Sequence, residues 1–159
     1  MVNKKLSMAI GATVVAAVVS CGFAPGAQAA PLPSQQTSSI TIAQQSKASQ
    51  AQKLARLVKA AQSSIPQIKK ISPGTYSSVQ IKAQNPGTIV YDYKFATHVN
   101  PALVKPYFTD EVALLRRATK ASVFPSMRLA GLTGTLHVVY KYRNSNGSTI
   151  WKKTFSSAK

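Results

Sequence analysis

Acidic residues are nearly missing from this sequence. Its 159 residues hold 20 Lys and Arg but only three Asp and Glu, which gives a formal net charge of +17. A net charge this far from zero bears on partners and solubility rather than on the fold. Three carboxylates also leave few groups for acid–base catalysis.

Cysteine and histidine are equally scarce. The chain has one cysteine, Cys21, and two histidines, His98 and His137. Two histidines far apart in the sequence, with three carboxylates, do not form a metal-ligand cluster. No glycine-rich phosphate loop is present either. We therefore expect neither a metal nor a cofactor.

No apolar run reaches the roughly 20 residues that a membrane-spanning helix needs. The longest apolar run, residues 6–19, follows Lys4 and Lys5 and precedes a Pro-Gly pair and the sequence Ala-Gln-Ala at 27–29. A basic start, an apolar centre and small residues at the cut are the three parts of a secretory signal peptide. The sequence predicts such a peptide over residues 1–29.

The single cysteine suggests a second way in which the exported chain could be processed. Residues 18–21, Val-Val-Ser-Cys, resemble a bacterial lipobox, in which the cysteine becomes the lipidated first residue, but the usual leucine is replaced by Val18. The Ala-Gln-Ala site favours cleavage after Ala29 and release as a secreted protein. The alternative is lipidation at Cys21 and anchoring at the outer face of the cytoplasmic membrane.

The chain left after cleavage has far more basic than acidic side chains. Its 130 residues keep 18 basic side chains against three acidic ones, a net charge of +15, and contain no cysteine. This length suits one domain with a core that needs no disulfides. The plausible anionic partners outside a cell are wall teichoic acid, a membrane surface, an acidic polysaccharide or an acidic protein.

Composition and periodicity divide the exported part into a lead-in and a domain. Residues 30–45 are uncharged and rich in Ser, Gln, Thr and Pro, which predicts a flexible polar lead-in before a single domain over residues 46–159. Within the domain, apolar spacing and turn residues predict helices over 46–64 and from Asn100 to a point before Pro125, and strands over 76–83, 88–95, 135–143 and 148–155.

This order of elements indicates the fold class. A helix and a hairpin, followed by a second helix and a second hairpin, give the order α-β-β-α-β-β, which is typical of an α+β protein. We expect a two-layer α/β sandwich in which a four-stranded antiparallel sheet carries its helices on one face.

Several short stretches carry a family resemblance. They are TIVYDYK at 88–94, YF at 107–108, SVFPSM at 122–127, Gly131, VVY at 138–140, NG at 146–147 and WKKTF at 151–155. Together they resemble a family of small exported bacterial domains of unknown function, mostly from Gram-positive bacteria and often lipoproteins. The resemblance covers roughly residues 50–156. It implies the fold and export, and it implies no chemistry.

Catalytic constellations are weak in this chain. Asp110 and Glu111 are neighbours on a predicted helix and point about 100° apart, which places them poorly as an acid–base pair. Asp92 and His137 lie on the polar faces of predicted strands and would form a pair if those strands were adjacent. No Gly-x-Ser-x-Gly nucleophile motif accompanies them. We expect no catalytic residue, with a hydrolase using Asp92 and His137 as the weaker hypothesis.

The polar side of the predicted strands is the strongest positive feature. Alternation places basic side chains there on the first three strands, namely Lys82, Lys94, Lys141 and Arg143, and either Lys152 or Lys153 joins them from the last strand, of which we take Lys152. Such a face would bind a polyanion without reading bases or sugars. The tyrosines at 91, 93, 140 and 142 fall on the opposite side, toward the helices, and this disfavours nucleic acid because stacking needs aromatics beside the cations.

These features support a non-enzymatic binding module that uses a basic surface to contact anionic polymers of the cell envelope or the extracellular space. The alternative hypothesis is a secreted protein-binding factor or inhibitor that presents the sheet or its loops to an acidic partner. The sequence does not indicate an oligomeric state.

Overall fold

The computed structural model describes residues 39–84 and 87–158, with side chains from residue 49 onward. In chain order its elements are α2 (Ser39–Gln62), α3 (Ile65–Ile71), β1 (Tyr76–Gln84), β2 (Thr88–Phe95), α4 (Pro101–Ala118), η1 (Thr119–Val123), α5 (Phe124–Leu129), β3 (His137–Arg143) and β4 (Thr149–Ser156). The signal peptide, Cys21 and most of the predicted lead-in lie outside the described residues.

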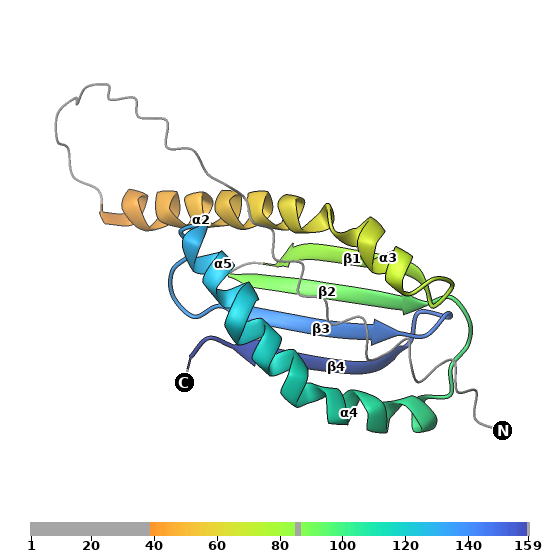
Figure 1. Ribbon diagram of the computed structural model, residues 1–159. Coiled ribbons are helices and arrows are strands. Elements are labelled where there is room, and N and C mark those ends of the chain that lie inside the picture. The colour runs from red at the N-terminus through yellow and green to blue at the C-terminus, as the bar shows by residue number, and fades with distance from the viewer. Residues whose placement is uncertain (1–38, 85–86, 159) are drawn as a thin grey trace.

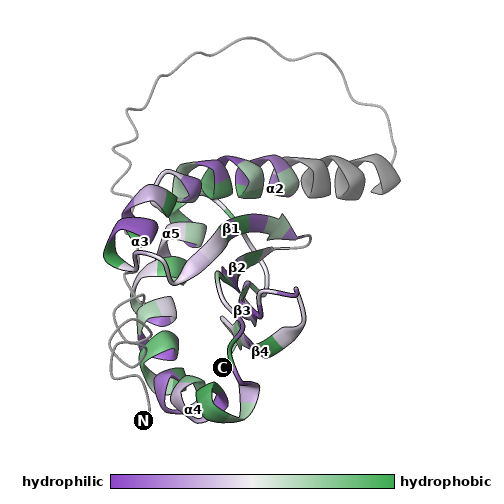
Figure 2. Cartoon of the chain, turned by 90° about the vertical axis from the view of Figure 1, so that its right-hand side faces the viewer, coloured by the Kyte–Doolittle hydropathy of each residue, from purple (hydrophilic) through white to green (hydrophobic). Residues whose placement is uncertain are grey.

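The domain has two layers. The four strands form one sheet; α3, α4 and α5 lie on one side of it, and α2 lies along the β1 edge, where the Gln62 side chain donates a hydrogen bond to the Ile81 carbonyl (Figure 1). Figure 2 views the strands end-on and shows α3, α4 and α5 on one side of them and α2 over the β1 edge. The predicted α+β class and two-layer architecture are therefore confirmed, and the other face of the sheet carries no described helix.

The prediction of a purely antiparallel sheet is wrong. Strand order is β1-β2-β3-β4; β1 pairs with β2 and β3 with β4 antiparallel, but β2 pairs with β3 in parallel. The reason is the connection between the hairpins. The run from α4 to α5 carries the chain back along the sheet to the end where β2 began, and such a crossover joins parallel strands.

The first helix begins earlier than the sequence predicts. The predicted lead-in extends to residue 45, whereas α2 starts at Ser39. Residues 39–45 contain no Gly or Pro, and extending a helix that is already formed costs far less than nucleating one. The predicted end is confirmed, since α2 stops at Gln62 and Pro66 lies in the first turn of α3.

The second helical run is shaped by its proline residues and a glycine. The side chain of Asn100 accepts a hydrogen bond from the Ala102 backbone nitrogen at 3.0 Å, which caps α4 as predicted. The π-helical turn η1 ends at Val123, two residues before Pro125, whose ring lacks an N–H and clashes with the carbonyl four residues earlier in a regular helix. Gly131, at φ 78°, then ends α5. Its N–H and that of Leu132 bond back into the last turn.

A ladder of aromatic rings fills the space between sheet and helices. Parallel register sets Tyr91 opposite Tyr140 and Tyr93 opposite Tyr142, and both pairs stack, with ring centroids 5.1 and 4.9 Å apart. Phe108 of α4 covers Tyr142 at 4.4 Å. The predicted helix-facing position of the four tyrosines is therefore confirmed, and the opposite face of the sheet carries mostly polar residues.

The buried tyrosines predict a loss of stability in alkali. Burial raises the pKa of both Tyr93 and Tyr142 well above the ordinary value of 10.0, and the charges of neighbouring tyrosines raise both pKa values further. Above pH 10 the unfolded chain releases these protons and the folded chain keeps them, so the free energy of unfolding falls as pH rises, by up to about 1.4 kcal/mol per pH unit for each tyrosine. Below pH 10 they add no pH dependence.

Denaturant melts between pH 9 and pH 12 measure this effect. Tyr142→Phe removes one of the titrating groups and keeps the ring, so its stability should fall less steeply with pH than that of the original chain. Equal slopes for the two proteins would show that Tyr142 ionises freely in the folded state.

Candidate anion-binding face

The open side of the sheet, which we call the basic face, collects the cations that the sequence predicts. Residues opposite one another in register share a face, and alternation along each strand fixes the rest. The predicted residues Lys82, Lys94, Lys141, Arg143 and Lys152 all lie on this face. Register also decides between two adjacent lysines, because Lys152 lies opposite Lys141 while Lys153 lies opposite Tyr140 on the helix side.

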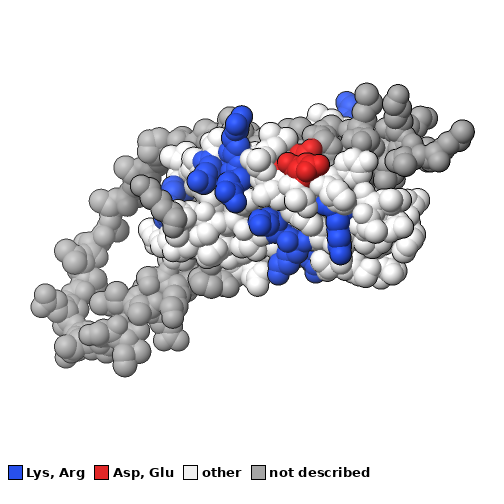
Figure 3. Space-filling view, turned by 90° about the horizontal axis from the view of Figure 1, so that it is seen from below, with Lys and Arg blue, Asp and Glu red and all other residues white. Residues whose placement is uncertain are grey.

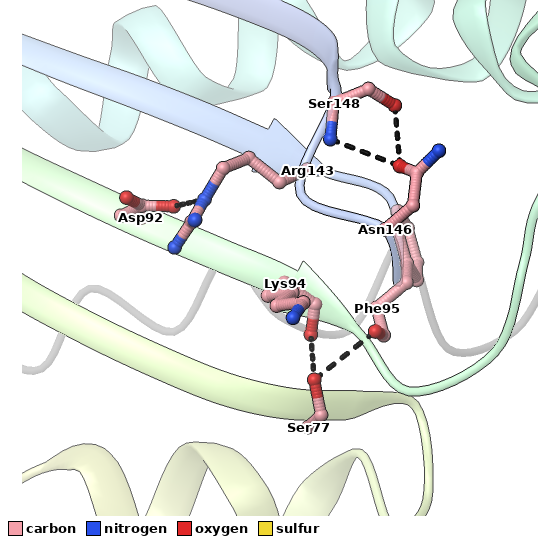
Figure 4. A network of polar contacts seen from close by, with 7 residues as sticks. All are labelled: Ser77, Asp92, Lys94, Phe95, Arg143, Asn146 and Ser148. Carbon is pink, nitrogen blue, oxygen red and sulfur yellow. Dashed lines mark hydrogen bonds and ion pairs between the residues drawn. The ribbon is translucent and has the colours of Figure 1, made fainter.

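One ion pair organises the centre of this face. Arg143 donates a hydrogen bond from Nε to Oδ1 of Asp92 at 2.7 Å, reaching from β3 across to β2 (Figure 4). The Asp92 side chain is only 9% exposed and that of Arg143 23%. It is the single ion pair in the described part of the chain. Among the described strand residues Asp92 is also the only carboxylate, so the lysines around it remain uncompensated.

The predicted pair of Asp92 and His137 does not form. His137 lies opposite Thr88, and Asp92 lies opposite Lys141. The two residues are therefore separated by four residues of strand, about 13 Å. The carboxylate is bonded to Arg143 instead. The geometric basis of the hydrolase hypothesis is thus wrong, because neither described histidine is bonded to this carboxylate.

The remaining acidic residues lie elsewhere. Asp110 and Glu111 are on α4, away from the sheet face. Within the described residues, no group of three or more His, Cys, Asp or Glu side chains is placed to hold a metal ion. The same part of the chain has no helix long and apolar enough to cross a membrane.

A shallow hollow of about 300 Å³ lies on the basic face. Lys82, Lys141 and Lys152 stand around it together with Asp92. Val90 and Val139, which are cross-strand partners, lie among them. An apolar floor surrounded by ammonium groups forms a positive concavity, where the lower local dielectric strengthens attraction for an anion.

Sequence reasoning missed this hollow and the partner of Asp92. The signal for the hollow was present, since Val90 and Val139 are apolar residues at positions where alternation expects polar ones. The ion pair was hidden, because Asp92 and Arg143 are 51 positions apart and become diagonal neighbours only through the parallel register.

Positive charge is not confined to the basic face. The helices also carry cations, among them Lys59, Lys69 and Lys105, which are exposed. Figure 3 views the molecule from below and shows several separate groups of Lys and Arg with one acidic patch between them. The basic face differs in that its cations come from adjacent strands of one sheet, where the register fixes the spacing of their Cα atoms.

Comparison of the chain with protein-family models, with curated proteins and with solved structures finds no match. The family resemblance in the sequence therefore stays a prediction.

Proposed function

We propose that this chain is an exported, non-enzymatic binding module whose basic face holds an anionic polymer of the cell envelope or the extracellular space. The observation that carries the proposal is the placement of five cations and one carboxylate on a sheet face that no described helix covers. Anionic groups of a polymer would meet cations that stand on a sheet rather than on a flexible tail, so less backbone freedom is lost on binding.

The charge of the remaining surface supports the same function. The chain keeps a net charge of +15 after removal of residues 1–29, which raises the local concentration of any polyanion and speeds its encounter with the protein. Long-range attraction of this kind brings the polymer to the molecule, and the basic face then determines where it lies.

Binding by charge predicts a steep dependence on salt. About four neutralised charges on a flexible strand, each releasing roughly 0.7 counterion, weaken binding roughly 50-fold for a fourfold rise in salt concentration. Titration of the purified protein with teichoic acid at several salt concentrations measures the slope. Affinity that is unchanged by salt, or no measurable affinity at low salt, would contradict the proposal.

The proposal also includes the exit route. We propose release after Ala29, because Ala-Gln-Ala matches the small residues that a signal peptidase requires. The intact mass of the exported protein tests this directly. A mass that begins at a lipidated Cys21 would instead confine the basic face to the surface of the producing cell.

A further inference from the structure

Four cations of the basic face form a continuous line across three strands. Lys152 on β4 lies opposite Lys141 on β3, and Arg143 follows two positions along β3, opposite Lys94 on β2. Opposite residues on neighbouring strands lie about 5 Å apart, and positions two apart on one strand lie about 7 Å apart. The line therefore runs diagonally over the sheet in steps of about 5, 7 and 5 Å. Lys82, on β1, lies apart from it.

The third position of this line is held in place. Nε of Arg143 is bonded to Asp92, and in the described part of the chain its two terminal nitrogens make no hydrogen bond. A guanidinium whose orientation is already set loses little freedom when it binds, and its terminal N–H groups match two oxygens of one phosphate. Arg143 thus presents two terminal N–H groups in a fixed orientation, a fork that stands between the flexible lysine side chains.

The surroundings of the line favour a strand over a lipid surface. Within the described residues the exposed large apolar side chains are Leu103, Tyr107, Leu114 and Leu129, which all belong to the helices. The basic face therefore has no apolar side chain of the kind that enters a bilayer. The hollow beside Lys141 and Lys152 extends toward Lys82 and is not lined by Arg143 or Lys94, so it adjoins one end of the line.

The spacing indicates the chemistry of that strand. Successive phosphates of a 1,3-linked glycerol phosphate chain are separated by twice as many bonds as successive Cα atoms, so they lie roughly 7 Å apart when extended and closer when bent. This range covers the steps of about 5 and 7 Å between the Cα atoms that carry the four cations, and the flexible lysine stems adjust the distances between the charges themselves. Over the described strand residues the face also has no Phe, Tyr or Trp, which a base-stacking site for single-stranded nucleic acid would need.

We propose that the basic face binds one strand of a linear polyol phosphodiester along the line Lys152–Lys141–Arg143–Lys94, with four consecutive phosphates in register. This inference rests on the proposed function and specifies its ligand. The lysines supply charge at the first, second and fourth positions. Arg143, oriented by Asp92, binds the third phosphate through its terminal N–H groups. It therefore determines the preference for phosphate over an anion of another shape, such as a carboxylate.

A length series of glycerol phosphate oligomers tests the register. Affinity of the purified protein should rise about 30-fold from two to four repeats, as two more cations are engaged. From four to eight repeats it should rise no more than about fivefold, because only additional binding registers are gained. A steep rise that continues beyond four repeats would overturn the four-phosphate line.

Two comparison ligands test the ligand class. Vesicles of phosphatidylglycerol present the same glycerol phosphate group on a surface, and oligoglutamate presents carboxylates on a strand. Both should bind at least about tenfold more weakly than the oligomer at equal charge. Equal or tighter binding of either ligand overturns the phosphodiester strand but leaves the proposed function standing. Failure of every polyanion to bind contradicts the proposed function itself.

A charge-conserving variant tests the role of Arg143. Arg143→Lys keeps the charge but loses the fork, and we expect about tenfold weaker binding of the four-repeat oligomer, with a smaller loss for oligoglutamate. Lys153→Gln is the control, because that side chain lies on the opposite side of the same edge strand and its loss should change affinity less than about twofold. An unchanged preference for phosphate in Arg143→Lys overturns the role of the fork.

Discussion

Neutralising three lysines of the basic face, in the combined variant Lys94→Gln, Lys141→Gln and Lys152→Gln, should weaken polyanion binding roughly 100-fold at low salt. Each cation close to an anionic partner contributes about 1 kcal/mol, and every 1.4 kcal/mol changes the affinity tenfold. Isothermal titration with teichoic acid measures the change. The fold should persist, since none of the three lysines belongs to the buried core.

The matched control removes the same charge from the helix layer. Lys59→Gln, Lys69→Gln and Lys105→Gln replace three exposed lysines on α2, α3 and α4 and lower the net charge equally. If the basic face binds the polymer, the affinity of this variant for teichoic acid should fall less than about threefold, because only the long-range attraction is weakened. Equal losses in the two variants would mean that binding depends on net charge and not on the face.

Phe108→Ala should lower the free energy of unfolding by about 3–5 kcal/mol, as truncation of a fully buried aromatic side chain leaves a cavity and removes its contacts. Phe108 is 1% exposed and packs against both Tyr142 and Trp151, with ring centroids 4.4 and 5.3 Å away. It therefore connects α4 to the two strands that carry Lys141 and Lys152. Denaturant unfolding followed by tryptophan fluorescence measures the loss.

Tyr107→Ala on the same helix is the control for this prediction. The Tyr107 side chain is 40% exposed, so its truncation should cost well under 1 kcal/mol. A Phe108→Ala variant as stable as Tyr107→Ala would show that α4 does not depend on this contact for its position over the sheet.

Local signals in the sequence were enough to predict the elements and the two layers. Alternation predicted β2 over the residues where it lies, and Asn100, Pro66 and Gly131 mark helix ends as expected. The direction of pairing between β2 and β3 was not predictable from either strand alone. It depends on how far the run from α4 to α5 carries the chain before β3 begins, which is a property of the packed fold.

For the candidate site, too, the sequence predicts the local features but not the contacts between strands. The side on which each cation lies follows from the period of two along a strand, so the sequence alone places Lys82, Lys94 and Lys141 on one face. It does not determine their partners, because the pairing of Asp92 with Arg143 instead of His137 depends on the parallel register. Asn144 is a similar case. The sequence predicts only a turn residue there, yet it is buried and exchanges two hydrogen bonds with the Val99 backbone.

Lysine footprinting with mass spectrometry tests the central claim most directly. The purified protein is acetylated with and without a saturating glycerol phosphate polymer, and the reactivity of each lysine is compared. We predict strong protection of Lys94, Lys141 and Lys152 and unchanged reactivity of exposed lysines on the helices such as Lys59 and Lys69. Uniform protection of all lysines, or protection confined to the helices, would contradict a binding site on the open face of the sheet.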